Sequence, residues 1–108
     1  MVWVAFIEVK ARLGRNADGT IGAFTYAVVE EHSRKRAAIR MRLAFRGDNF
    51  FVVDFDEFMP YEQFEDPSDM ITAMAEEAKK TGQVITDELT GFEFDYKEEA
   101  AGTWSELV

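Results

Sequence analysis

The N-terminal third of the chain predicts a β-hairpin, which constrains the fold more than any other feature. Val2–Leu13 places apolar side chains on one face and, from Glu8 onward, charged side chains on the other. This period of two is typical of a half-buried strand. Asp18-Gly19 is a common pair in type I′ turns, and Ile21–Glu31 reads as the returning strand. A turn at that pair would place Leu13 opposite Phe24, Ala11 opposite Tyr26 and Val9 opposite Val28. The apolar start of the first strand indicates that both of its faces are covered near residues 2–7.

The next segment, Ser33–Arg46, is compatible with a helix or a strand. Ser33 is a good N-cap, Gly47 is a good stop residue, and the interior consists almost wholly of strong helix formers. One apolar stripe has helical spacing: Ala37, Ala38, Met41, Ala44 and Phe45. The alternation of apolar residues with arginines supports a strand instead, and Ile39 and Leu43 lie off the helical stripe. We favour the helix because propensity and capping agree.

The stretch Asn49–Asp66 combines aromatic and acidic residues and contains no Lys or Arg. Its first part, Asn49–Glu57, reads as a strand with Phe51, Val53 and Phe55 on the core side and Asp54 and Asp56 on the other. The alternation fails at Phe58, so we expect a bulge or the strand end near Glu57. Pro60 cannot donate to a sheet ladder, and Met59–Asp66 is therefore expected to be an exit loop.

The remainder predicts a second helix and short strands. Pro67 and Ser68 mark the start of the helix and Gly82 its end. Its expected buried stripe is Met70, Ile71, Met74, Ala75 and Ala78. Gln83–Thr86 and Gly91–Tyr96 read as extended segments.

Together these elements predict an α+β fold. We expect a mostly antiparallel sheet with two helices on one face, in the order ββαβαβ, as a variant of a ferredoxin-like plait. The alternative is a ββββαβ meander with one helix. Residues 1–96 would form a single α+β domain, and 97–108 a loose C-terminal tail in which the docking of Trp104 is left open.

Composition excludes several classes of function. The chain has no cysteine, which removes disulfides, thiolate metal sites and cysteine nucleophiles. Its longest apolar run, Val2–Ile7, is far below the roughly 18 residues of a membrane span. We therefore expect a cytoplasmic protein with no membrane partner.

Charge is divided unevenly along the chain. The net charge is −9, yet residues 1–47 carry nine Lys/Arg and four Asp/Glu, whereas residues 48–108 carry three Lys and seventeen Asp/Glu. Phosphate repels such an acidic field, so nucleic acid is not an expected partner. The basic run Arg34–Arg46 could bind phosphate or an acidic partner, although neutralisation of the protein's own acids is the default interpretation.

Little in the sequence indicates catalysis. Asp54 and Asp56 could share a divalent cation, or one of them could act as an acid or base, and Arg40 or Arg42 is available to neutralise them. The only histidine, His32, has no partner nucleophile nearby. We expect no catalytic residue, no cofactor and no metal site beyond these two candidates, and we lean against an enzyme.

The acidic exit loop is the candidate recognition surface. Aromatic side chains set among acids are typical of interface anchors, although the loop could also fold back and cap the core. The expected partner-binding residues are Glu57, Phe58, Tyr61, Glu62, Phe64, Glu65 and Asp66. They predict a non-enzymatic acidic binding module that docks a basic protein, as an inhibitor, an immunity-type protein or an anti-defence protein would. The alternative function is a small-molecule or metal-dependent site at Asp54 and Asp56.

A homodimer is the remaining possibility for a partner. It would form through an open sheet face that carries Val4 and Phe6.

Overall fold

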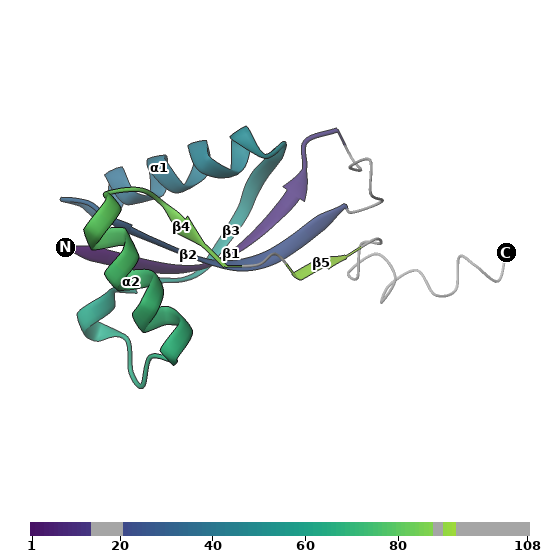
Figure 1. The fold of residues 1–108 in the computed structure, drawn as a ribbon. Coiled ribbons are helices and arrows are strands. Elements are labelled where there is room, and N and C mark those ends of the chain that lie inside the picture. Colours follow the sequence, from purple (N-terminus) through teal and green to yellow (C-terminus); the bar gives the residue numbers. More distant parts are fainter. Residues whose placement is uncertain (14–20, 88–89, 93–108) are drawn as a thin grey trace, which may run out of the picture.

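The computed structural model describes residues 1–13, 21–87 and 90–92, which form an antiparallel sheet and two α-helices (Figure 1). The elements are β1 (Val2–Ala11), β2 (Gly22–Glu30), α1 (Arg34–Gly47), β3 (Phe50–Pro60), the 3-10 helix η1 (Tyr61–Gln63), α2 (Asp69–Thr81), β4 (Ile85–Thr86) and β5 (Thr90–Phe92). The strand order is β3-β1-β2-β4, and β5 also pairs with β2. The α+β class is confirmed, and the helix at 34–47 excludes the meander alternative.

The hairpin is confirmed, but its predicted register is wrong. Val9 lies opposite Ala23 and Ala5 opposite Ala27, a shift of five residues from the pairing expected for a turn at Asp18-Gly19. That turn lies outside the described residues. The observed register places the small residues Ala23 and Ala27 beneath α1, where a helix can approach the sheet closely.

Capping and an apolar stripe define α1. The Ser33 hydroxyl accepts a hydrogen bond from the Arg36 N–H at 3.2 Å, as an N-cap does. Ala37, Met41 and Phe45 are buried, whereas Leu43 is 60% exposed. The helix ends one residue later than predicted, with Gly47 inside it and Asp48 as the C-cap.

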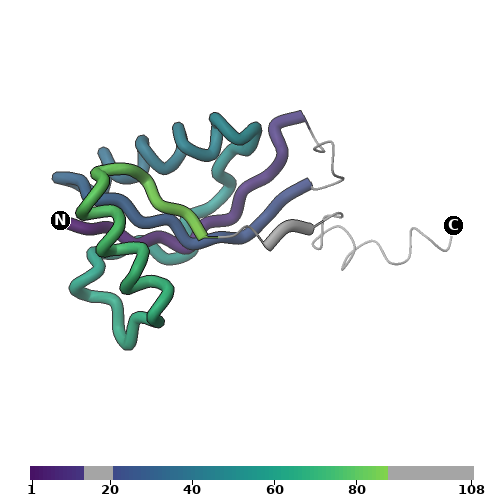
Figure 2. Tube along the Cα trace, in the orientation of Figure 1, coloured from purple at the N-terminus to yellow at the C-terminus, as the bar shows by residue number. Residues whose placement is uncertain are grey.

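The two helices lie on opposite faces of the sheet, so the prediction of both helices on one face is wrong. Odd-numbered residues of β1, such as Ile7 and Val9, pack with α1. Val2 and Val4 are even-numbered, so their side chains lie on the other face of the sheet, where they pack with α2. Figures 1 and 2 show α1 on one side of the strands and α2 on the other. The physical reason is that β1 begins with apolar residues of both parities, and each apolar face requires a cover.

Two β-bulges change which side chains of β3 face each side of the sheet. Phe55 and Glu57 lie opposite two consecutive residues of β1, so Asp56 between them has no partner on that strand. In the same way, a second bulge leaves Val53 without a partner on β1. Each inserted residue reverses the parity of the rest of the strand. The predicted buried face of β3 is therefore wrong at two positions, because Phe51 is 48% exposed and Val53 is 42% exposed. Four residues of β3 instead contribute to the α1 side: Phe50, Val52, Phe55 and Phe58.

The strand also runs further than predicted, to Pro60. Because β3 is the edge strand of the sheet, a proline without an N–H is compatible with it. The bulge predicted near Glu57 is confirmed at Asp56.

The second helix follows its sequence signals closely. The Ser68 hydroxyl accepts from the Ile71 N–H at 3.2 Å, and Gly82 adopts the left-handed φ of 69° that ends many helices. The predicted stripe is buried except at Met70, which is exposed. Tyr96, residues 97–108 and Trp104 lie outside the described residues.

Gly82 provides a test of the α2 cap. Gly82→Ala is expected to lower the free energy of unfolding by about 1 kcal/mol, because an L side chain disfavours the left-handed conformation even though nothing crowds the added Cβ. Urea denaturation of both proteins measures the difference. Gly47→Ala is the matched control, since Gly47 lies in α1 without a positive φ and an alanine there should be neutral or stabilising. Equal destabilisation by both substitutions would contradict this role of Gly82.

Candidate functional site

The aromatic residues that come after the bulge anchor the exit loop to the core. The Tyr61 hydroxyl shares a hydrogen bond of 3.1 Å with the Thr72 hydroxyl of α2. The Phe64 ring meets the Tyr26 ring edge to face, with centroids 6.4 Å apart. Both rings pack against the buried cluster beneath α2. The loop therefore folds back onto the protein, as the capping interpretation of its aromatics requires.

Phe58 has a structural role on the α1 face of the sheet, opposite to the face on which Tyr61 and Phe64 pack. Its ring lies 5.8 Å from that of Trp3 in an edge arrangement and 4.9 Å from that of Phe55. The Arg34 guanidinium sits 4.9 Å above the Phe58 centroid. Phe58 is therefore separated by the sheet from Phe64, and the structure does not bring all seven predicted residues together.

Folding back creates a groove beside the edge strand. Its volume is about 440 Å³, and we call it the acidic groove; it is lined by Glu57, Met59, Gln63, Phe64 and Glu65. Three of the predicted residues line it, namely Glu57, Phe64 and Glu65, whereas Phe58, Tyr61, Glu62 and Asp66 do not. Glu62 and Asp66 are exposed on the loop.

Met59 and Gln63 were missed by the sequence interpretation. Met59 lies opposite Val4 and Glu57 opposite Phe6, so both point to the α2 side of the sheet. The sequence signal for Met59 is the alternation of inward and outward side chains, which restarts after the bulge at Asp56. From the sequence alone, this short continuation of the strand cannot be distinguished from a loop. For Gln63 no sequence signal exists, because its position depends on the turn of η1.

The carboxylates of the acidic groove have no counter-charge in the part of the chain that the structure describes. Of the described residues, no basic side chain lines the groove and none forms an ion pair with Glu57 or Glu65. The basic residues of α1 lie across the sheet, since α1 covers the face opposite to α2. The default expectation that the basic run neutralises the protein's acids therefore fails for this groove.

Asp54 and Asp56 have no third metal ligand beside them among the described residues. Both are exposed, and because Asp56 is the bulged residue the two do not occupy successive positions on one regular face. Within residues 1–13, 21–87 and 90–92, no three His, Asp or Glu side chains gather as a metal site would require. The arginines expected to neutralise the two aspartates have other contacts. The Arg42 guanidinium stacks 4.9 Å above the Phe55 ring.

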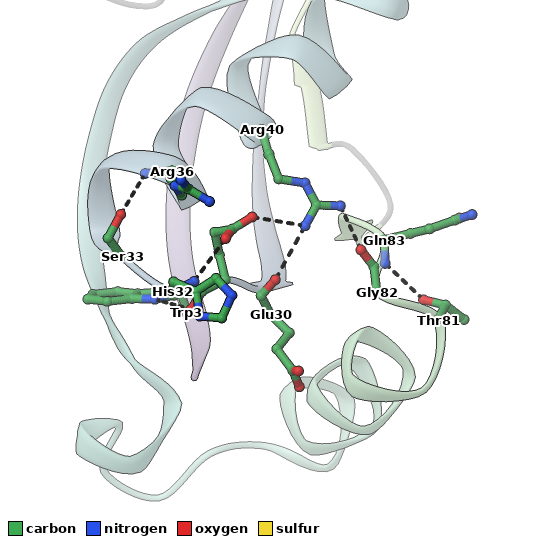
Figure 3. Close-up of polar contacts among 10 residues, drawn as sticks. Trp3, Glu30, His32, Ser33, Arg36, Arg40, Thr81, Gly82 and Gln83 are labelled. Carbon is green, nitrogen blue, oxygen red and sulfur yellow. Dashed lines mark hydrogen bonds and ion pairs between the residues drawn. The ribbon is translucent and has the colours of Figure 1, made fainter.

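Arg40 joins three elements at one end of the molecule (Figure 3). One of its nitrogens donates to the Gly82 carbonyl at 2.6 Å, and the other contacts the Glu30 carbonyl at 3.3 Å and the Glu31 carboxylate at 3.4 Å. The backbone N–H of His32 also donates to the Glu31 carboxylate, at 2.9 Å. Arg40 thus connects α1 to β2 and to the C-cap of α2, which gives it a structural role.

The Glu31 contacts predict a pH-dependent contribution to stability. The hydrogen bond from the His32 N–H, assisted by Arg40 and Arg36, lowers the pKa of Glu31 below its ordinary value. Because the pKa of Glu31 is lower in the folded state than in the unfolded state, its ionised carboxylate stabilises the fold at any pH above the unfolded-state pKa. This stabilisation is lost as the pH falls through the folded-state pKa. Glu31→Gln should therefore lower the Tm at pH 7 and have progressively less effect below pH 4.5.

Glu30→Gln is the matched control for that prediction. Figure 3 shows the Glu30 carboxylate pointing away from Arg40. Arg40 contacts Glu30 at its backbone carbonyl oxygen, which the substitution retains. Differential scanning fluorimetry across pH should show little change for this variant. A pH-independent effect of Glu31→Gln would contradict the prediction.

Part of the sheet face proposed for a homodimer is covered within the chain. Val4 is fully buried beneath α2, and the Phe6 ring packs against Phe24 at 6.1 Å and Tyr26 at 4.8 Å between centroids. Dimerisation itself stays a prediction.

None of the helices in the described ranges is long and apolar enough to cross a membrane.

Comparison with known proteins assigns no relative to the chain. The chain matches no protein-family model, no curated protein and no solved structure.

Proposed function

We propose that the chain is a non-enzymatic binding module whose acidic groove docks a basic segment of a partner protein. The observation that carries this proposal is the pairing of an apolar floor, Met59 and Phe64, with two carboxylates, Glu57 and Glu65, that form no ion pair with any described residue. Lysine and arginine combine an aliphatic stem with a charged head. A side chain of either type would pack its stem on the floor and bring its head to the carboxylates.

The charge of the whole chain supports a basic partner. Residues 48–108 carry fourteen more acids than bases, and a field of this sign accelerates the approach of a positively charged surface. Inhibitors, immunity-type proteins and anti-defence proteins use such a surface to occupy a basic binding groove or active site on their target. We propose this class of role for the chain.

The contacts of Tyr61 and Phe64 with the rest of the fold support recognition by a preformed surface. Tyr61 is held by Thr72, and Phe64 is packed on Tyr26. A surface held in its binding conformation loses less conformational entropy when the partner docks. The aromatic residues of the loop therefore serve recognition by holding the carboxylates in position.

A variant of the ferredoxin-like plait is the narrower fold that we propose. It is supported by the β2-α1-β3 unit, in which β2 and β3 are parallel and β1 lies between them. The position of α2 on the opposite face is where the chain departs from that plait.

Nuclear magnetic resonance tests the proposed function. Titration of the ¹⁵N-labelled protein with an amphipathic peptide of lysine and leucine should shift the resonances of residues 57, 59 and 63–65 first, and a peptide of glutamate and leucine should leave them unchanged. Shifts spread evenly over every acidic surface, including Glu76 and Glu77 on α2, would contradict a defined docking site.

A further inference from the structure

We propose that a second pocket, formed by three arginines over aromatic and apolar residues of β3, binds a small phosphate ester with an apolar or aromatic moiety. The pocket has a volume of about 270 Å³, and we call it the arginine pocket; it is lined by Arg12, Arg42, Arg46, Phe50, Phe51 and Val52. The inference is independent of the acidic groove. It concerns a ligand of opposite charge at different residues.

The fold brings the three arginines to one end of the sheet. Ala11 at the end of β1 lies opposite Phe50 at the start of β3, and the Arg12 N–H donates to the Asn49 carbonyl at 2.9 Å. Arg42 and Arg46 are four residues apart in α1 and therefore share one side of that helix. Figures 1 and 2 show the end of α1 leading directly into β3 beside the end of β1.

The turn between α1 and β3 is held in an uncommon conformation. Asn49 has a φ of 65°, which asparagine tolerates better than most residues but which is still unfavourable. Hydrogen bonds from the Asp48 and Asn49 N–H groups to the Phe45 and Arg46 carbonyls fix this turn. Those bonds also satisfy carbonyls at the helix end, so the Arg46 side chain is not required to cap them.

The arginines of the pocket have no counter-ion among the residues that the structure describes. No carboxylate of the described residues forms an ion pair with Arg12, Arg42 or Arg46, and the one contact found for these guanidinium groups is that of Arg42 with the Phe55 ring. This is notable in a chain with 21 acids and 12 bases, where an arginine could readily be paired. Three like charges in one pocket repel one another, and a bound anion would offset that repulsion. Among residues 1–13, 21–87 and 90–92, no acid neutralises the C-terminal end of the basic run.

The chemistry of the lining specifies the ligand. Guanidinium groups match the geometry of phosphate oxygens with paired N–H donors, which makes arginine the usual residue for phosphate recognition. Phe50, Phe51 and Val52 also line the pocket; Phe50 is buried, so the apolar surface available to the organic part of an ester comes from Phe51 and Val52 at the pocket's edge strand. A pocket near the lower end of the size range of small-molecule sites suits a ligand such as a nucleoside monophosphate. A long polyanion is disfavoured, because the remainder of the chain is strongly acidic.

Calorimetry and ¹⁵N chemical shifts with three probes test the proposal. Adenosine monophosphate, inorganic phosphate and adenosine are titrated separately at low ionic strength. We expect the monophosphate to bind at least tenfold more tightly than either of the other two, with shifts at residues 12, 46 and 50–52. Equal binding of inorganic phosphate and the ester would overturn the role of the apolar floor. No binding of any of the three probes at 5 mM would overturn the proposal.

Substitutions assign the binding to these residues. Arg12→Gln/Arg46→Gln should weaken monophosphate binding at least tenfold, and Arg46→Lys should retain part of it because the charge remains without the guanidinium fork. Lys35→Gln/Lys79→Gln removes the same two charges outside the pocket and should have less than a twofold effect. All four replaced side chains are exposed, so each variant should keep the fold, which circular dichroism verifies. An equal loss in both double variants would overturn the site.

Discussion

Phe45→Ala is expected to lower the free energy of unfolding by about 3–5 kcal/mol, the usual cost of removing a buried aromatic side chain. Phe45 is 2% exposed and packs in the cluster that joins α1 to β1, β2 and β3. A domain of this size has a total stability of roughly 5–15 kcal/mol, so the variant should be marginally folded. Guanidinium denaturation followed by circular dichroism measures the change.

Leu43→Ala is the control on the same helix. Leu43 is 60% exposed, and its replacement should change stability by less than about 0.5 kcal/mol. Comparable losses in the two variants would mean that the buried stripe of α1 is not the one described.

Charge reversal in the acidic groove is expected to have the largest effect on binding. Glu57→Lys/Glu65→Lys replaces two attractions with two repulsions at a basic partner. Exposed ion pairs contribute up to about 1 kcal/mol each, so reversal of both should weaken binding of the lysine-leucine peptide by about tenfold to a hundredfold. Isothermal titration calorimetry at 50 mM salt measures the loss, which should shrink as salt screens the charges.

Glu76→Lys/Glu77→Lys makes the same change in net charge away from the groove. Both glutamates are exposed on α2, and neither lines the acidic groove. This variant should lose less than threefold in affinity through the weaker overall field. If both variants lose affinity equally, only net charge matters and the groove has no special role.

The helices were predictable because their signals are local. Ser33 and Ser68 each cap a helix through one hydroxyl, and Gly82 takes the left-handed conformation that few other residues accept. Such contacts lie within one turn of chain. The preference for a helix over a strand at Ser33–Arg46 rests on such a cap and on helix propensity, although the alternation of arginines with apolar residues opposes it.

The sheet details were not predictable because they depend on distant packing. The hairpin register is selected by small residues that lie beneath α1, such as Ala23 and Ala27. The bulges at Val53 and Asp56 reverse the parity of β3, so Phe51 is exposed and Phe58 is half-buried. A strict period of two cannot contain these insertions.

The candidate site was predictable in charge but not in shape. The acidic residues Glu57 and Glu65 could be selected from composition, and both line the groove. Its other walls depend on the β3 bulge and on η1, which place Met59 and Gln63 beside them. The arginine pocket depends on the approach of Arg12 to the end of α1, a contact between residues more than thirty positions apart.

Site-specific photo-crosslinking at the acidic groove tests the docking of a basic partner without assuming which protein that partner is. Benzoylphenylalanine replaces Gln63, an uncharged exposed residue of the lining, or Ala73, an exposed residue of α2, as the control. After irradiation in the native cell extract, mass spectrometry identifies the crosslinked proteins and peptides. We expect a basic protein, crosslinked through a Lys- or Arg-rich segment, from position 63 and not from position 73. Equal crosslinking from both positions, or an acidic protein captured at position 63, would contradict the proposed docking site.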